Sequence, residues 1–261
     1  MVAALSATAV ERGVFGARLF YAAEVGSTND LAAAAAERDE PEGTTFVAGA
    51  QTAGRGRLGR AWFSPPGAGL YVSTIIRRQA LAPWITLAGG VAVAEGIRAA
   101  TGLPVQIKWP NDIVAVGGAG FQARRKIAGL LAEASSGPHG VQYVVLGMGI
   151  NLGPASFPPE LAGRAGSIEG ELGRPVDPGQ VLAGVLVALN RTLGDLVGAG
   201  PSGLLDRWLA LAPSAQGAAI GWDGPSGPQT GVTAGIDSDG ALLARTAGGL
   251  ARIIAGEVRW T

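Results

Sequence analysis

The residues best suited to chemistry lie in two short runs, residues 54–60 (GRGRLGR) and residues 108–112 (KWPND). Glycines in the first run let the backbone approach a ligand closely, because they lack a Cβ. Its arginines offer planar, permanently charged donors that suit carboxylate and phosphate oxygens. The second run sets one lysine beside a tryptophan and then turns at Pro-Asn-Asp. Together they indicate a specific pocket for a small anion or a nucleotide phosphate.

The overall composition narrows the function classes. The 261 residues include 20 basic and 20 acidic side chains, which argues against the extended basic face of a non-specific nucleic-acid binder. The absence of cysteine excludes thiol nucleophiles, disulfides and thiolate metal sites. The single histidine, His139, excludes a multi-histidine metal site, and we expect it to be a solvated residue of its Ser-Ser-Gly-Pro-His-Gly turn.

The hydropathy pattern indicates a soluble, cytoplasmic protein. No segment reaches 18 uninterrupted apolar residues, so we expect no membrane span. The N-terminus lacks a basic region followed by an apolar stretch and a cleavage site.

The first half of the chain must provide the elements that position the two runs. Residues 18–25 read as a strand, and Ser27, Thr28 and Asn29 are good N-caps for an alanine-rich helix over about residues 30–38. A strand over 44–50 leads through Gln51 into the arginine–glycine run. Further strands are expected at 62–64, 70–77 and 105–109, the last carrying Lys108. A helix is expected over 84–100, with a left-handed cap at Gly102.

The second half predicts a hairpin, two helices and a small second domain. The hairpin joins 113–116 to 126–133 through a glycine-rich, basic tip at 117–125, and a buried strand at 141–146 runs into Gly147. Helices are expected at 178–197 and 201–210. From about residue 213, short alternating runs with turns predict a β-barrel. The fold is thus expected to be α+β: a mixed β-sheet with flanking helices over 1–212, and a C-terminal barrel over 213–261.

Five motifs occur together and in one order: GSTN at 26–29, QTAGRGR at 51–57, KWPND at 108–112, KIAGLLAE at 126–133 and GMGINL at 147–152. In this combination the chain resembles the biotin protein ligases, also called biotin–acetyl-CoA-carboxylase ligases or holocarboxylase synthetases. The resemblance runs from Tyr21 to Leu152 and resumes more loosely between 235 and 258. It implies a class II synthetase-like ligase domain followed by an SH3-like barrel.

The resemblance also implies a reaction. Biotin's carboxylate would attack the α-phosphate of ATP, with Mg²⁺ as cofactor, to give biotinyl-5′-adenylate and pyrophosphate. A lysine of a biotin carboxyl carrier protein domain would then attack the mixed anhydride and release AMP. Neither step needs an enzyme nucleophile, and both need positive charge against the developing phosphorane.

Roles for individual residues follow from their positions in the matching motifs. Lys108 would bridge the biotin carboxylate and the α-phosphate, while Arg55 and Arg57 would order the loop over biotin and the phosphates. Other binding candidates are Ser27, Thr28 and Gln51 at the ureido head, Trp62 against the apolar bicycle, Lys126 and Arg60 at phosphate, Asn151 at adenine, Asn29, Gly54, Gly56 and Asn111 in the same motifs, and Gly129 and Gly147 leaving room for ligand. Asn111 and Asp112 are the candidate Mg²⁺ ligands, and Asp112 is also a candidate base for the acceptor lysine.

Several alternatives remain open. A lipoate or octanoate ligase or transferase shares the fold, although the octanoyltransferases use a cysteine. A non-catalytic biotin sensor would bind biotin without adenylating it. Some members of the family carry an N-terminal winged helix-turn-helix; only about 20 residues precede the first matching strand here, so we expect a monofunctional ligase without operator binding.

Two surface features also have more than one reading. The 117–125 tip either only lengthens its hairpin or brings Arg124 and Arg125 to an acidic surface of the acceptor. Exposed sheet strands could pair edge to edge in a homodimer.

Overall fold

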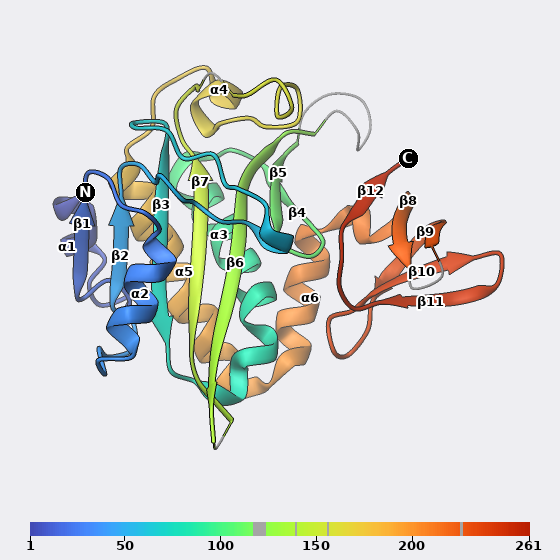
Figure 1. Ribbon diagram of the computed structural model, residues 1–261, viewed down its shortest axis with the longest axis horizontal. Coiled ribbons are helices and arrows are strands. Elements are labelled where there is room, and N and C mark those ends of the chain that lie inside the picture. Colours follow the sequence, from blue (N-terminus) through green and yellow to red (C-terminus); the bar gives the residue numbers. More distant parts are fainter. Residues whose placement is uncertain (117–123, 139, 156, 225–226) are drawn as a thin grey trace.

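The computed structural model describes residues 1–116, 124–138, 140–155, 157–224 and 227–261. His139 and residues 117–123 of the expected hairpin tip lie outside the described residues. A seven-stranded sheet with helices on both faces makes up most of the molecule, and a smaller all-β unit lies beside it (Figure 1). This arrangement confirms the predicted α+β fold.

The large sheet is mixed, as predicted, with strand order β1-β2-β3-β7-β6-β5-β4. Strands β1 and β2 are parallel, and every other neighbouring pair is antiparallel. Their bounds are β1 Leu19–Ala22, β2 Thr45–Ala48, β3 Gly69–Ile76, β4 Val105–Lys108, β5 Asp112–Ala115, β6 Lys126–Gly137 and β7 Gly140–Asn151.

The main core lies between the sheet and the long helices on one face. These are α3 (Ile85–Thr101), α5 (Pro178–Ala199) and α6 (Pro201–Leu211). Helix α3 ends at Gly102, whose φ of 75° is the left-handed cap that the sequence predicts. Pro178 opens α5, and Asp177 caps it by accepting a hydrogen bond from the Gly179 backbone N–H at 2.7 Å.

Two segments, Gln79–Thr101 and Pro178–Ala199, are long and apolar enough to cross a membrane by length and composition alone. In the fold, most of their apolar residues are buried against the sheet and against each other. The helices touch closely at Gly96, where a Cβ would lie 2.5 Å from the Val185 backbone. Their apolar character is therefore accounted for by their position in the core.

Helix α2 (Thr28–Ala36) covers part of the other face of the sheet (Figure 1). Its alanines pack on Ile75, Tyr143 and Val145 in a small separate cluster. The helix starts slightly earlier than expected, with Ser27 at the N-cap position. The Ser27 side chain makes no capping hydrogen bond, so its hydroxyl is left for another partner.

The strand expected at residues 62–64 is not formed, and this prediction was wrong. Trp62 donates its backbone N–H to the Gly54 carbonyl at 2.9 Å and so belongs to the arginine–glycine loop. The two prolines that follow Ser64 have no N–H to extend a ladder.

The remaining short elements join the larger ones. They are α1 (Val2–Ala7), η1 (Arg57–Gly59), η2 (Gln79–Trp84), α4 (Ile168–Leu172) and η4 (Pro213–Ala215).

The all-β unit is an antiparallel five-stranded sheet in the order β11-β10-β9-β8-β12, in agreement with the SH3-like barrel that the sequence predicts. Its bounds are β8 Gln216–Gly224, β9 Gly227–Ile236, β10 Leu242–Thr246, β11 Gly249–Ile253 and β12 Val258–Trp260. Trp109, which directly follows β4, ties the two units together by donating its indole N–H to the Gly240 carbonyl at 3.1 Å.

Candidate active site

One row of residues crosses the large sheet and defines the floor of the site. In the strand register, Lys108 pairs with Asp112, Asp112 with Gly129, Gly129 with Gly149, and Gly149 with Tyr71. Directly paired residues point to the same face of a sheet, so all five share the face that carries α2. The KWPND, KIAG and GMG motifs are thus brought side by side.

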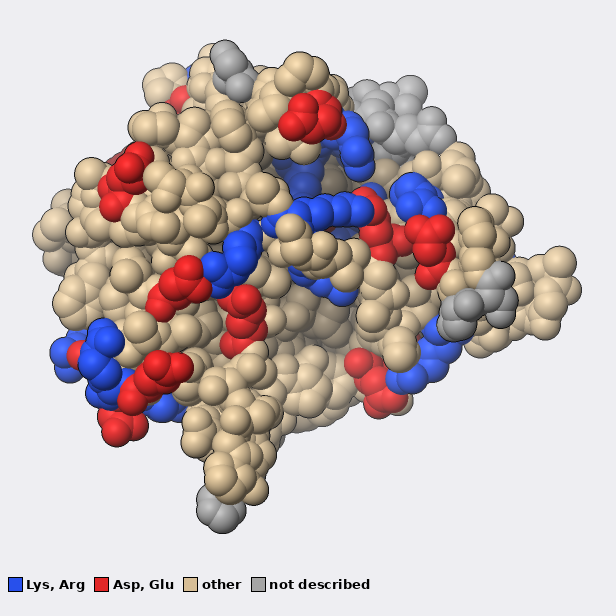
Figure 2. All heavy atoms as spheres, viewed as in Figure 1, with Lys and Arg blue, Asp and Glu red and all other residues tan. Residues whose placement is uncertain are grey.

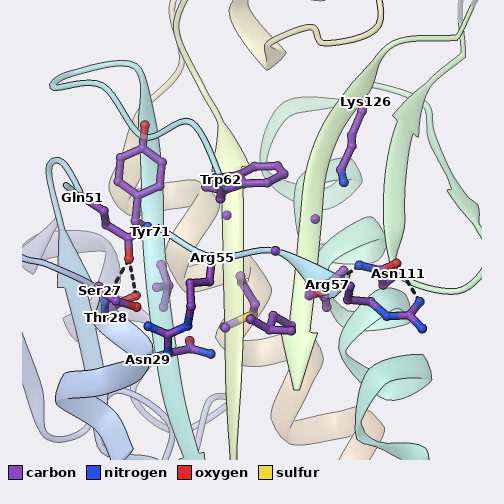
Figure 3. Close-up of a pocket in the computed structure, with 18 residues that line it drawn as sticks. Ser27, Thr28, Asn29, Gln51, Arg55, Arg57, Trp62, Tyr71, Asn111 and Lys126 are labelled. Atoms are coloured by element: carbon purple, nitrogen blue, oxygen red, sulfur yellow. Dashed lines mark hydrogen bonds between the residues drawn. The ribbon is translucent and has the colours of Figure 1, made fainter. Parts of the chain in front are cut away.

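A cavity that opens to solvent lies over this floor; together with the adjoining open space it measures about 460 Å³. Figure 2 shows basic side chains gathered around a hollow on this face, with acidic side chains beside them. Figure 3 shows how the side chains converge on the cavity from the two sides. Its lining residues include Ser27, Thr28, Asn29, Gln51, Arg55, Gly56, Arg57, Trp62, Tyr71, Asn111, Lys126, Gly129, Gly147 and Gly149.

The glycines of the floor make room for the protein's own side chains. A Cβ at Gly149 would lie 2.3 Å from the Trp62 indole nitrogen, and one at Gly129 would lie 2.9 Å from the same ring. A Cβ at Gly147 would lie 2.3 Å from the Asn29 side-chain oxygen. We expected Gly129 and Gly147 to leave space for ligand, whereas here Trp62 and Asn29 take that space and form the cavity wall.

Neutral polar groups are preorganised at one end of the cavity. Gln51 Oε1 accepts from the backbone N–H of Thr28 at 2.9 Å and from its hydroxyl at 3.1 Å, while Gln51 Nε2 donates to Ser64 Oγ at 3.0 Å. Gly54 permits this packing, because a Cβ there would lie 3.0 Å from Gln51 Nε2 and 2.6 Å from the Trp62 carbonyl. The buried Ser27 lies beside them.

The three arginines of the loop have three different surroundings. The Arg55 guanidinium donates two hydrogen bonds to the Asp30 carboxylate, at 2.6 and 2.9 Å. Its Nη2 also lies 3.5 Å from Glu133 Oε2. Arg57 is half-buried and donates to Asn111 Oδ1 at 3.3 Å; burial lowers the pKa of its guanidinium. Arg60 reaches out of the cavity to Glu257 of the small unit, at 2.6 Å. Among the three, Arg55 and Arg57 line the cavity.

The sequence has only two lysines, Lys108 and Lys126, and each faces a tryptophan. The Lys126 ammonium pairs with Asp112 at 2.6 Å and lies 5.0 Å from the centre of a Trp62 ring. The Lys108 ammonium lies 4.7 Å from a Trp260 ring centre, in a small pocket shared with the β-unit and outside the cavity lining. Burial lowers the pKa of Lys108, and the charges of Asp112 and Glu257 oppose that shift.

Asn151, the candidate residue for binding adenine, forms a hydrogen bond to the backbone and does not line the cavity. Its buried amide donates to the Gly166 carbonyl at 2.9 Å and thereby fixes the segment after β7. It is outside the cavity lining, so its contact with adenine stays a prediction.

The two candidate Mg²⁺ ligands already have protein partners. Asn111 donates to the Leu130 carbonyl at 2.7 Å, and Asp112 pairs with Lys126. Within the part of the chain that the structure describes, no three His, Cys, Asp or Glu side chains gather as a metal cage. Because Mg²⁺ is commonly held by one or two carboxylates plus substrate phosphates, Asp112 fits this ion only together with a bound nucleotide.

Sequence reasoning missed several residues around the site, among them Asp30, Tyr71, Glu133, Gly149, Glu257 and Trp260. Tyr71 forms a wall of the cavity, donates its hydroxyl to the Pro65 carbonyl at 3.1 Å, and has a pKa raised to about 12 by burial. Strand alternation could have found Tyr71, which lies two residues before Ser73 on the same face, and Ser73 donates its hydroxyl to Thr28 Oγ1 at 2.7 Å. Glu133 ends the KIAGLLAE motif, but nothing local indicates that it and Asp30 face Arg55. Glu257 and Trp260 reach the site only through the packing of the β-unit.

Comparison with known proteins gives one consistent result. The Biotin/lipoate A/B protein ligase family matches residues 21–151, and the Biotin protein ligase C terminal domain matches residues 224–259. The bifunctional ligase/repressor BirA of Bacillus spizizenii is 34% identical, over 94% of this chain and 74% of its own length. The biotin–[acetyl-CoA-carboxylase] ligase of Paracoccus denitrificans is 33% identical, over 80% of this chain and 86% of its own.

A solved structure shows the same architecture. The Aquifex aeolicus biotin protein ligase, in complex with biotin and ATP, superposes with a TM-score of 0.79 at 29% identity. The match covers 94% of this chain and 100% of that one.

Proposed function

The chain belongs to the biotin/lipoate A/B protein ligase family, and on that premise we propose that it ligates biotin to a lysine of a biotin carboxyl carrier protein domain through biotinyl-5′-adenylate. The relatives named as biotin ligases, and the similar structure with biotin and ATP, support the enzyme class. One feature of the site carries the proposal further: its two ends differ in charge.

At one end, Ser27, Thr28 and Gln51 present hydroxyl and amide groups; at the other lie Arg57 and Lys126 (Figure 3). Arg55 also lies near the first end, where Asp30 and Glu133 offset its charge. A urea head needs neutral donors and acceptors, whereas a carboxylate beside a triphosphate needs cations. Trp62 lies between the two ends and Tyr71 lies beside Gln51 (Figure 3); both supply apolar walls for a bicyclic ring. The cavity therefore matches biotin lying along it with its carboxylate toward the cations.

The first step forms one bond and breaks one. A biotin carboxylate oxygen bonds to the α-phosphorus of ATP, and the bond from that phosphorus to the pyrophosphate oxygen breaks. Arg57 and Lys126, with Lys108 at the adjoining edge of the sheet, supply the positive charge that offsets repulsion between the two anions. Preorganised donors of this kind contribute a few kcal/mol each. Asp112 would hold Mg²⁺ together with the phosphates of the nucleotide, and the ion would supply further positive charge there.

In the second step, the acceptor amine attacks the biotinyl carbonyl, an amide forms, and AMP leaves. The amine must be neutral, and with a pKa of about 10.4 only about one in 10³ is neutral at pH 7. Asp112 stays the candidate base; in the structure one of its carboxylate oxygens is already engaged in the 2.6 Å ion pair with Lys126.

The deciding experiment is exchange of labelled pyrophosphate into ATP, with biotin, lipoate and octanoate in parallel. Exchange driven by biotin alone is the expected result, while exchange driven by lipoate would assign the runner-up function. Biotin binding without any exchange would identify a sensor. We expect Lys108→Ala to lose exchange by orders of magnitude with biotin binding retained, and Lys108→Arg, which keeps the charge, to be less impaired. Near-normal turnover in Lys108→Ala would refute the assignment of Lys108.

Further parts of the proposal concern the rest of the chain. We assign the ligase activity to residues 1–212 and the barrel to 213–261, and we expect a cytoplasmic protein. Residues before β1 form a six-residue helix and turns. Absence of operator binding stays part of the proposal; a sequence-specific gel shift with this chain would contradict it. An edge-to-edge homodimer through exposed sheet strands stays a prediction, and light scattering would test it.

A further inference from the structure

The β-unit brings one aromatic ring to the lysine on which the proposed chemistry depends. Trp260, on β12, lies 4.7 Å from the Lys108 ammonium, measured to a ring centre. The guanidinium carbon of Arg124 lies 5.8 Å from a ring of the same tryptophan. Lys108 and Trp260 are far apart in sequence and belong to different sheets. The contact exists only because the β-unit packs against β4.

Among the described residues, Lys108 forms no hydrogen bond and no ion pair, and its ammonium contacts only the ring of Trp260. The other lysine differs, since Lys126 has both a ring and the Asp112 carboxylate. The charges that face Lys108 do so at longer range: Asp112 from β5, Glu257 from the β-unit, and Lys126 and Arg164 as like charges. Arg60 occupies Glu257 at close range.

An aromatic face attracts a cation without accepting a strong hydrogen bond from it. A carboxylate at this position would also hold the ammonium, but it would neutralise the charge and use its donors. A tryptophan face is the strongest aromatic partner for a cation and leaves the three N–H donors of lysine available to an incoming anion.

We propose that Trp260 is the positioning residue for Lys108: its ring holds the ammonium in the small pocket between the two units and leaves its donors free for the carboxylate and the α-phosphate. This inference rests on the proposed ligase function. The β-unit then completes the active site, since Trp260 is its contribution to the reacting end. The Trp109–Gly240 hydrogen bond fixes the two units at the same point.

Because the sequence has only two lysines, the Lys108–Trp260 contact can be tested directly. Protein labelled with ¹³C-lysine gives two ε-methylene signals, which Lys126→Arg assigns. In the wild type we expect the Lys108 signal to be shifted upfield by the indole ring. Trp260→Leu should return it to the random-coil position and leave the Lys126 signal unchanged, whereas Trp260→Phe should keep part of the shift.

The same variants are then compared in biotin-dependent pyrophosphate exchange. We expect Trp260→Leu to lower kcat roughly threefold to thirtyfold, the range of one cation–π contact, with KM for biotin unchanged and with partial rescue in Trp260→Phe. Leu250→Ala, at an exposed site of the same barrel, is the matched control and should behave as wild type.

The possible outcomes distinguish the role of Trp260 from the proposed ligase function. An unshifted Lys108 signal in the wild type, or wild-type kcat in Trp260→Leu, would overturn the role of Trp260 and leave the ligase function intact. No biotin-dependent exchange in the wild type would overturn both. Equal losses in Trp260→Leu and Trp260→Phe would indicate general disruption of the barrel and also refute the positioning role.

Discussion

Trp62 lies directly over Gly149, so close that a Cβ added to Gly149 would be 2.3 Å from the indole nitrogen of Trp62. The two belong to different motifs, the arginine–glycine loop and the GMG strand end. Their contact sets the distance between the loop and the floor of the sheet, and thereby the depth of the cavity.

Gly149→Ala should therefore displace Trp62 and weaken biotin binding. Forcing a methyl group into such a contact typically costs 1–3 kcal/mol, so we expect affinity to fall roughly tenfold or more while the fold is kept. Isothermal titration with biotin measures the effect. Gly203→Ala, where a Cβ meets nothing within 4 Å, is the control. Unchanged affinity in Gly149→Ala would mean that Trp62 does not wall the biotin site.

Asp30→Asn should loosen the arginine–glycine loop, because Arg55 loses its two charged hydrogen bonds to that carboxylate. Both side chains are partly exposed, so the effect is small, about 0.2–1 kcal/mol, or up to roughly fivefold faster trypsin cleavage within residues 54–60. Asp206→Asn, an exposed aspartate on α6, serves as the reference. Biotin and ATP should slow cleavage in all variants; equal cleavage of Asp30→Asn and wild type would show that the pair does not hold the loop.

The pH dependence of adenylation should reflect Lys108. Burial lowers its pKa, so its charged form is lost at a lower pH than for a free lysine, near 10.4. The alkaline limb of kcat/KM, which reports the free enzyme, should accordingly fall below that value. In Lys108→Arg the limb should disappear, since arginine stays charged. A limb that persists in Lys108→Arg would assign the titration to another group.

Gly96→Ala should destabilise the ligase domain. The added methyl group would lie 2.5 Å from the Val185 backbone and push α3 and α5 apart, a change that costs about 1–3 kcal/mol. Gly194→Ala, on the exposed side of α5 with nothing within 4 Å, should instead be stabilising by up to about 1 kcal/mol. Thermal or urea unfolding distinguishes them. Similar midpoints for the two variants would contradict the close helix packing.

The sequence predicted the elements best where local signals are strong. Helices α3, α5 and α6 were expected within a few residues of their bounds, because Gly102, Pro178 and Pro201 mark ends that depend on neighbouring residues only. The strand expected at 62–64 failed for the opposite reason. Aromatic residues favour strands in general, but here Trp62 is used to cover glycines on β6 and β7.

The site was predicted only in part, for a similar reason. Arg57 and Arg60 are the same residue type three positions apart, yet one lines the cavity and the other pairs with Glu257, 197 residues away. No local pattern distinguishes them. Trp260 was missed because its partner, Lys108, lies on another sheet, and only the packing of the two units brings them together.

The scarcity of lysine has a consequence for a protein that would make an activated acyl group. A mixed anhydride acylates any accessible amine, including those of the enzyme that forms it. Guanidinium groups stay protonated and do not compete as nucleophiles. Of the 20 basic residues only two are lysines, and tryptophan rings lie against both. The chain thus offers its own product few places for self-labelling, and an acceptor amine has little competition from the enzyme's surface.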